Sequence, residues 1–453
     1  MTAPRPLPPS FCPERFSLRQ PIAAVRGLPC ALSDEPMEIA LEEDRLTVAF
    51  CAPVRRLQQK TQVFPLDIKA ATRSRLTHSM ELAAYARVLV LGLRGACPDL
   101  DLWRSAILTC LHNAALLHDI GNPPFGHFGE ELIRTFLSRA CREFASDLTA
   151  EQVTDLCNFN GNAQGLRIMH SLQELNLTFV QLASVLKVPF TAAELAAQGS
   201  HAPEYINAHA GVFLSELPLV ERMRTCGCLR TRHCLSVLLE LCDDLAYTLA
   251  DLEDAQDRGL LSSAAAVDEL ALLLSALPLP GPISAAGMRE SLVPALRSLR
   301  RELPGLLFSE VRTAVERDPR AFIEGGQLAW EGDPPGRQLL GRLMDYALRH
   351  IYRNEELGSL ELSGAHYLEV LLDKYQVLLH CTRGEFLAAL DGRGGPGLLR
   401  RLARRIPRRH RAAYLRRSRD GDELYWRIRL MVDYISGMTD SFARAEYRLL
   451  TGQ

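Results

Sequence analysis

The sequence of 453 residues predicts a mostly α-helical protein. Apolar residues return every three or four positions through most of the chain, and few stretches alternate with a period of two, which is the pattern of helices rather than strands. Hydrophobic residues make up 47% of the chain, which is enough for a large buried core. Irregular connectors rich in proline and glycine separate the periodic stretches at 277–283, 331–337 and 391–397. None of these connectors is long enough to require a domain boundary.

The N-terminal part begins without a periodic pattern. Residues 1–36 are rich in proline, and we expect them to form a loosely ordered arm. From 38 to 57 apolar residues follow a loose helical spacing, although Leu46, Val48 and Phe50 alternate, so a short strand there stays open. Any helix should end near Thr61, because Pro65 prevents the chain from re-entering one.

After Pro65 helical patterns dominate the sequence. The ranges with apolar residues at helical spacing are 75–94, 103–119, 127–145, 151–157, 163–171, 178–186, 232–256, 264–276, 286–302, 338–352, 361–381, 384–391, 397–405, 409–417 and 424–450. The net charge of the chain is −2, but between Arg400 and Arg419 there are ten arginines and no carboxylate. This charge run is either a solvated helix face or a surface that binds phosphates or single-stranded nucleic acid.

Cysteine usage and hydropathy indicate the compartment. The twelve cysteines are scattered, and Cys226 and Cys228 are the only close pair. The chain starts without a charged-then-apolar leader, and apolar runs such as 88–93 are too short to cross a bilayer. We therefore expect a cytoplasmic protein with reduced thiols and no membrane association.

The stretch from Leu116 to Glu130 contains the largest cluster of potentially catalytic or metal-binding side chains. An apolar helix ends at His118-Asp119, a pair of side chains that suits a divalent metal because imidazole nitrogen and carboxylate oxygen are common metal ligands. A glycine and two prolines then stop the helix and stiffen the loop. His127 and Glu130 follow at a spacing of three, as on one helical turn. The stretch thus predicts a metal-ligand pair and an acid/base pair one loop apart.

Two other stretches offer candidate partners. His78 begins a predicted helix with Arg75 on the same face, and a cation beside a metal ligand suits a polyphosphate substrate. On the predicted helix from 232 to 257, Asp243, Tyr247 and Asp251 line one face. That stripe is either functional or part of an acidic solvated face. His112 lies on a different face from His118, and we expect it to be structural.

These segments together resemble the HD-domain deoxynucleotide triphosphohydrolases, the bacterial dGTPases. The segments that carry the resemblance are Arg75-Leu76-Thr77-His78-Ser79-Met80-Glu81, the stretch around His118-Asp119, and Cys242-Asp243-Asp244-Leu245-Ala246-Tyr247. A histidine, then His-Asp, then a distant Asp is the metal signature of that superfamily. The resemblance implies an HD-domain helical fold with additional C-terminal helices. Residues 37–260 would form the phosphohydrolase core, and 261–453 would complete the nucleotide pocket and the oligomer contacts within one compact unit.

The resemblance also implies roles for individual residues. His78, His118, Asp119 and Asp243 would bind Mg²⁺ or Mn²⁺, and His127 with Glu130 would be the catalytic proton-transfer pair. The implied substrate contacts are Gln62 and Val63 at the deoxyribose, Arg75 and Lys187 at the phosphates, Tyr247 stacking on the substrate, Asp251 at the 3′-hydroxyl, Tyr352 and Glu361 at the base, and Asn162 and Arg401 at positions that the resemblance does not specify. The chain departs from the family at His209, where the family carries a second lysine before a glycine.

The expected function is metal-dependent hydrolysis of dGTP, and of other dNTPs, to a deoxynucleoside and tripolyphosphate. Resemblance further implies a homo-hexamer. Two alternatives stay open at this point. One is another HD phosphohydrolase, such as a 5′-nucleotidase or a cyclic-nucleotide phosphodiesterase. The other is a regulatory protein that binds single-stranded DNA through the arginine run and hydrolyses nucleotides only secondarily.

Overall fold

The computed structural model describes residues 37–65, 71–198, 209–229, 231–275, 285–394, 397–418 and 422–452, and this part of the chain is mostly helical, as predicted. The α-helices are α1 (Met37–Phe50), α2 (Ala52–Arg56), α3 (Arg75–Gly92), α4 (Pro98–Leu102), α5 (Arg104–Leu117), α6 (Gly126–Glu143), α7 (Ala150–Cys157), α8 (Gly161–Arg167), α9 (Phe179–Val185), α10 (Ala192–Gln198), α11 (Leu217–Thr225), α12 (Cys234–Asp257), α13 (Ala264–Leu274), α14 (Ala285–Glu290), α15 (Val293–Arg317), α16 (Pro319–Gly325), α17 (Pro335–Ala347), α18 (Glu355–Tyr375), α19 (Arg383–Leu390), α20 (Gly397–Arg405), α21 (Arg408–Arg417), α22 (Glu423–Ser436) and α23 (Asp440–Thr451). Short helical turns continue several of them, including η2 (Ile168–Leu172) and η5 (Leu348–Tyr352). Among the described residues the only β pairing is an isolated bridge between Thr61 and Ser74.

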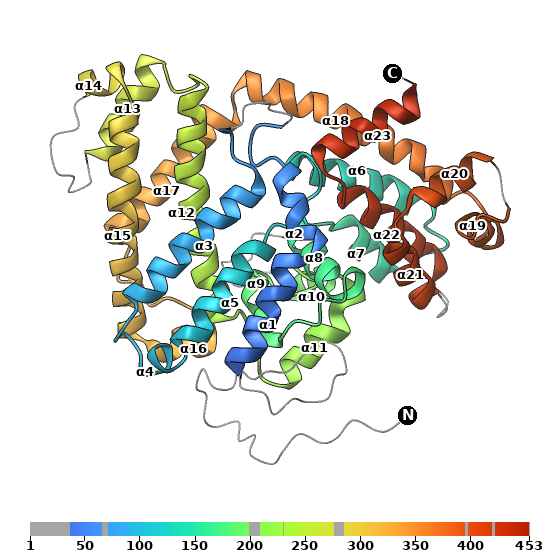
Figure 1. Cartoon of the computed structure of the whole chain (residues 1–453), viewed down its shortest axis with the longest axis horizontal. Helices are drawn as coiled ribbons and strands as arrows, with labels where there is room; N and C mark the ends of the chain where they lie inside the picture. Colours follow the sequence, from blue (N-terminus) through green and yellow to red (C-terminus); the bar gives the residue numbers. More distant parts are fainter. Residues whose placement is uncertain are drawn as a thin grey trace, which may run out of the picture.

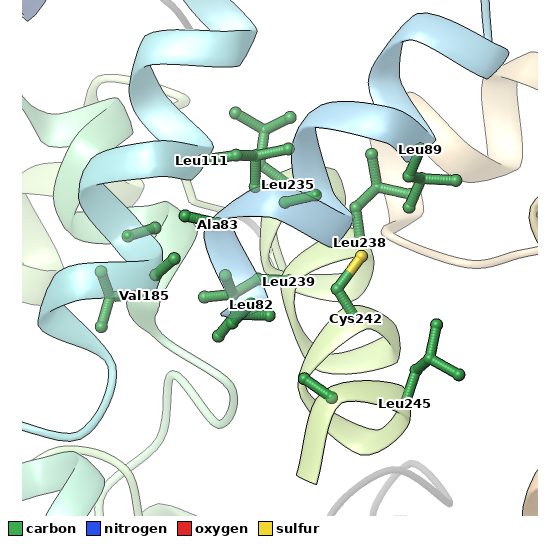
Figure 2. Packing of buried hydrophobic residues seen from close by; sticks show 14 of the residues in the cluster. Leu82, Ala83, Leu89, Leu111, Val185, Leu235, Leu238, Leu239, Cys242 and Leu245 are labelled. Carbon is green, nitrogen blue, oxygen red and sulfur yellow. The ribbon is translucent and has the colours of Figure 1, made fainter. Parts of the chain in front are cut away.

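The central core forms around α3, α5, α9 and α12. Leucines at helical spacing on α12 pack beside Leu82, Ala83 and Leu89 of α3 (Figure 2). Each fully buried leucine contributes about 1.5–3 kcal/mol relative to an exposed one, so this face fixes how α12 lies against α3. The polar stripe of α12 is thereby turned toward the other side, where the functional site lies.

A second apolar cluster joins α6 to the C-terminal helices. It includes Phe125 and Phe136 from the α6 region, Leu368 on α18, and residues of α19 to α22. In Figure 1, α12, α13, α15 and α17 stand on one side of the central helices, and α18 runs from that side toward α20 to α23. No helix in the described part of the chain is both long and apolar enough to span a lipid bilayer.

Residues 46–50 belong to α1, so the strand that their alternation left open does not form. Several predicted boundaries were wrong. The range 424–450 is two helices, because α22 ends at Ser436 and Thr439 is the N-cap of α23. The range 286–302 is also divided, and its second part, α15, continues past Pro304 to Arg317. The helix predicted over 361–381 already begins at Glu355. The predicted N-terminal arm, 1–36, lies outside the described residues.

Candidate active site

Three ligand-type side chains meet where α3 and α5 pack together. His78 comes from the first turn of α3, His118 ends α5, and Asp119 follows it; one ligand atom of each lies within 4.8 Å of the others. The Nδ1 of His118 lies 2.8 Å from the carbonyl oxygen of Ala115, which places the ring hydrogen on Nδ1 and leaves a lone pair on Nε2. That Nε2 is buried and has no hydrogen-bond partner. An unpartnered buried imidazole lone pair beside a carboxylate fits a divalent cation.

Asp243 reaches the same point from the middle of α12. Its Oδ1 lies 3.0 Å from Nε2 of His78 and 3.4 Å from Nε2 of His118. Burial opposes ionisation of Asp243, but the Lys187 ammonium and the two imidazoles hold the pKa of this carboxyl well below its usual range. The structure therefore brings together all four residues that the sequence predicted as metal ligands, and their two imidazoles and two ionised carboxylates form a suitable donor set.

A cationic side chain donates a hydrogen bond to the Oδ2 atom of each of the two carboxylates, Asp119 and Asp243. Arg75 donates to Oδ2 of Asp119 at 2.5 Å, while Lys187 donates to Oδ2 of Asp243 at 2.7 Å. The side-chain amide of Asn122 donates to the other oxygen of Asp119 at 2.7 Å. These contacts orient the carboxylates, and they leave two positive groups at the place where a phosphate would approach the ion.

His127 and Glu130 form a pair at the start of α6. The His127 side chain is 93% exposed, and its Nδ1 lies 3.3 Å from Oε2 of Glu130. Glu130 is buried, and its Oε1 accepts a hydrogen bond of 2.7 Å from the Gly161 backbone N–H. Burial raises the pKa of Glu130, but the bonds from His127 and Gly161 outweigh burial and lower it below the ordinary value. Glu130 is thus an ionised carboxylate that orients the accessible imidazole of His127.

The loop that joins the two pairs packs directly on α8. A Cβ at Gly121 would lie 2.1 Å from the Gly161 carbonyl oxygen and 2.2 Å from the Gly165 nitrogen, so no larger residue fits there. This close approach positions the Gly161 N–H for Glu130 and places Asn162 on the cavity wall.

One cavity of about 530 Å³ joins these groups, a volume typical of ligand sites. Of the predicted residues, those that line it are Gln62, Val63, Arg75, Asp119, His127, Glu130, Asn162, Lys187, Asp243, Tyr247, Asp251, Tyr352 and Glu361. Arg401 does not line this cavity; it is exposed on α20. His209 is exposed and His112 half-buried, and neither lines the cavity.

The wall away from the metal-ligand group carries unpaired polar atoms. The Tyr352 hydroxyl donates to Oδ2 of Asp251, whereas Oδ1 of Asp251 is buried without a partner. Burial raises the pKa of Asp251 to about 7, against the opposing effect of the Tyr352 bond. The side-chain oxygen of Gln62 is likewise buried and unpartnered. Such atoms are costly unless a ligand supplies hydrogen-bond donors.

Sequence reasoning missed other parts of the site. Asp244 lines the cavity, and burial raises its pKa to about 7, although the sequence analysis assigned no role to it. Asn122 and Asn160 also line it. The position of Asn122 three residues after Asp119 was an available signal, because a polar residue at that spacing can bond the carboxylate. Asp440 supports the site from the far end of the chain, and no local pattern indicates that contact.

Comparison with known proteins gives a consistent result. The HD domain family model matches residues 75–179, which include His78, His118, Asp119, His127 and Glu130. A probable deoxyguanosinetriphosphate triphosphohydrolase of Pseudomonas aeruginosa is 34% identical over 91% of this chain and 92% of its own length. The deoxyguanosinetriphosphate triphosphohydrolases of Enterobacter sp. (32% identical; 90% of this chain and 93% of theirs) and Yersinia pestis (30%; 96% and 98%) are similar along nearly their whole length. With this extent of similarity around a candidate metal site, the chain belongs to the deoxyguanosinetriphosphate triphosphohydrolase family of HD-domain hydrolases.

Proposed function

We propose that this protein hydrolyses dGTP to deoxyguanosine and tripolyphosphate. The observation that carries the proposal is the convergence of His78, His118, Asp119 and Asp243 beside a nucleotide-sized cavity. Asp119 and Asp243 line this cavity, whereas His78 and His118 are buried next to them and do not line it. These four residues would hold Mg²⁺ or Mn²⁺ and leave coordination positions open. Such an ion lowers the pKa of a bound water and offsets charge on the α-phosphate.

The chain's own side chains would do the remaining work. Arg75 and Lys187 would neutralise phosphate charge, because both cations face the cavity beside the ligand carboxylates. His127 would transfer a proton at the reacting oxygens. Its Nδ1 faces Glu130, so Nε2 is the nitrogen available to the substrate. The departing 5′-oxygen is a poor leaving group and needs such an acid.

Nucleoside selection would depend on the opposite wall. The unpaired oxygen of Asp251 supports a contact to the sugar 3′-hydroxyl, Gln62 lies on the same cavity wall for the deoxyribose, and Tyr247 offers a ring for stacking. Glu361 is an acceptor for guanine N1–H and N2–H₂. Glu361→Gln should lower the preference for dGTP over dATP at least about tenfold, since the variant turns a donor toward guanine. Glu355→Gln, an exposed position on the same helix, is the control.

The experiment that tests the reaction is product chromatography with all four dNTPs and GTP, using Mg²⁺ or Mn²⁺. Tripolyphosphate and a deoxynucleoside are expected; orthophosphate or a monophosphate would favour a 5′-nucleotidase or phosphodiesterase instead.

His127→Ala should nearly abolish turnover, while metal and substrate still bind. His380→Ala is a matched control, because its Nδ1 lies 3.5 Å from Glu143 outside the cavity. A wild-type rate in His127→Ala would refute the role of this histidine.

We also propose that the chain works as a cytoplasmic homo-hexamer. The exposed position of Arg401 supports an interface at which it reaches the cavity of another copy. The ten free thiols among the described residues support a reducing compartment. Light scattering tests the assembly, and Arg401→Ala should lower activity only if the copies associate. Exposed arginines on α20 support binding of single-stranded DNA, which should weaken with salt and with charge reversal at Arg400 and Arg404.

A further inference from the structure

Outside the active-site cavity, one carboxylate binds the turn that carries Tyr352. Glu269 lies on α13, is half-buried, and does not line the cavity. Its Oε2 lies 2.8 Å from Nε2 of His350, and its Oε1 accepts a hydrogen bond from Arg349. The hydrogen bond from His350 lowers the pKa of Glu269 below its ordinary value, so this carboxylate is ionised and acts as the acceptor. Glu269 therefore binds two consecutive residues of η5, the turn that ends at Tyr352.

The turn that Glu269 binds is a π turn. The helix α17 ends at Ala347, and the chain continues through η5 with the wider hydrogen-bonding pattern of a π-helix. Such turns are rare, occur mostly as single turns and are often found at functional sites. His350 contacts α13 from one side of η5 and Tyr352 contacts α12 from the other, because residues two positions apart point to roughly opposite sides of a helical turn. The contacts of Glu269 on one side of η5 therefore help to fix Tyr352 on the other.

A second contact joins this region to α13. Tyr346 is buried near the end of α17, and its ring centroid lies 4.5 Å from that of His350. The Tyr346 hydroxyl donates to the carbonyl oxygen of Ala266 at 3.0 Å. Ala266 lies three residues before Glu269 on the same helix, so α13 holds the end of α17 and η5 at two neighbouring points.

Tyr352 acts on the cavity wall through Asp251. Its hydroxyl donates to Oδ2 of Asp251, and Oδ1 of the same carboxyl group is buried without a partner. Both residues line the active-site cavity. The bond at Oδ2 orients the carboxyl group, so that Oδ1 is the atom available to a hydroxyl of the sugar. A displacement of η5 would break the bond at Oδ2 and release the orientation of Oδ1.

We propose that Glu269 is a positioning residue for recognition of the sugar 3′-hydroxyl. Glu269 holds η5, η5 places Tyr352, and Tyr352 orients Asp251. The inference rests on the proposed hydrolysis of dGTP and on the proposed contact of Asp251 with the 3′-hydroxyl. Glu269 itself lies outside the cavity, so it acts on the choice of sugar and takes no part in the chemical step. The compounds that report on this role are dGTP and 2′,3′-dideoxyguanosine triphosphate, which differ only in that hydroxyl.

The test compares kcat/KM of the full chain for dGTP with kcat/KM for the dideoxy compound. Glu269→Ala should lower the ratio of these two values at least about threefold, because η5 loses the carboxylate that holds it and Asp251 loses its fixed orientation. Glu269→Gln keeps one acceptor oxygen and should retain most of the wild-type ratio. Asp268→Ala is the matched control, because this adjacent carboxylate pairs with Arg289 of α14 at 2.6 Å and should leave the ratio unchanged.

A double variant tests the route by which Glu269 acts. Tyr352→Phe removes the hydroxyl that orients Asp251, so Glu269→Ala/Tyr352→Phe should show the same ratio as Tyr352→Phe alone. A further loss in the double variant, or a wild-type ratio in Glu269→Ala, would overturn the positioning role and leave the proposed hydrolysis intact. A wild type that hydrolyses both compounds equally well would overturn the positioning role together with the contact of Asp251. Absence of dGTP hydrolysis in the wild type would overturn the proposed function and, with it, this inference.

Discussion

Replacement of Asp440 by asparagine should damage the active site from a distance. Asp440 is buried at the first position of α23, and one of its oxygens accepts the Thr61 backbone N–H at 2.9 Å. Its other oxygen accepts the Phe125 backbone N–H at 3.1 Å. Thr61 and Phe125 both line the catalytic cavity, and Phe125 lies two residues before His127. One carboxylate thus ties two cavity walls to the C-terminal helix.

The expected loss of stability in Asp440→Asn follows from the hydrogen bonds that Asp440 accepts. Asparagine has one acceptor oxygen, so one of the two backbone N–H groups would face an NH₂ group and remain unpaired. A buried unpaired donor costs roughly 1–3 kcal/mol, and loss of charge assistance adds about 1 kcal/mol. We expect Asp440→Asn to lower the free energy of unfolding by roughly 2–4 kcal/mol.

Activity should fall as well. Phe125 has a φ of 63°, a left-handed conformation that costs a non-glycine residue about 1–2 kcal/mol. Without the bond to Asp440, this backbone can relax and move His127 away from its working position. The value of kcat/KM for dGTP should drop at least about tenfold, because misplacement of a catalytic group is costly.

Urea denaturation and steady-state kinetics measure the two effects. Asp345→Asn is the matched control, because Asp345 is exposed on α17 and does not line the cavity. If Asp440→Asn matched the wild type in both stability and kcat/KM, the inference that this carboxylate positions the catalytic loop would be wrong.

The parts of the site that could be predicted lie on short local patterns. The spacing of Asp243, Tyr247 and Asp251 places all three on one face of α12, and the apolar residues of the other face turn that stripe toward the cavity. Local sequence likewise indicates that His118 ends a helix, since Gly121 and the two prolines follow. The structure then brings these local groups together, as the family resemblance implied.

The features that could not be predicted depend on residues that are far apart in the sequence. In sequence the arginine run looks like one charged surface. In the structure Arg405 pairs with Glu446, and Arg416 pairs with Glu174. Arg408 instead lines a hollow together with residues of α2. No local rule anticipates these pairings. Short helices such as α4 and α16 were missed because a helix of one or two turns shows too little periodicity to be recognised.

Two further substitutions test how the site is held. Gly121→Ala should destabilise the protein by roughly 3 kcal/mol or more in thermal unfolding, because its Cβ meets backbone atoms of α8; Gly358→Ala, with no atom within 4 Å, should instead stabilise α18 by about 0.5–1 kcal/mol. Lys60→Met removes a buried amine that donates to the carbonyl oxygens of Asn122 and Ser436. Burial lowers the pKa of Lys60 from 10.5 to about 7, so between these pH values the unfolded chain binds a proton that the folded chain has lost. The wild type should therefore gain stability as pH rises, by about 1.4 kcal/mol per pH unit, and lose that gain as pH falls toward 7. Lys60→Met lacks this contribution. The unfolding free energy of the wild type minus that of Lys60→Met should therefore become more positive between pH 7 and pH 9 in urea titrations. A constant difference would show that Lys60 keeps its proton in the folded state.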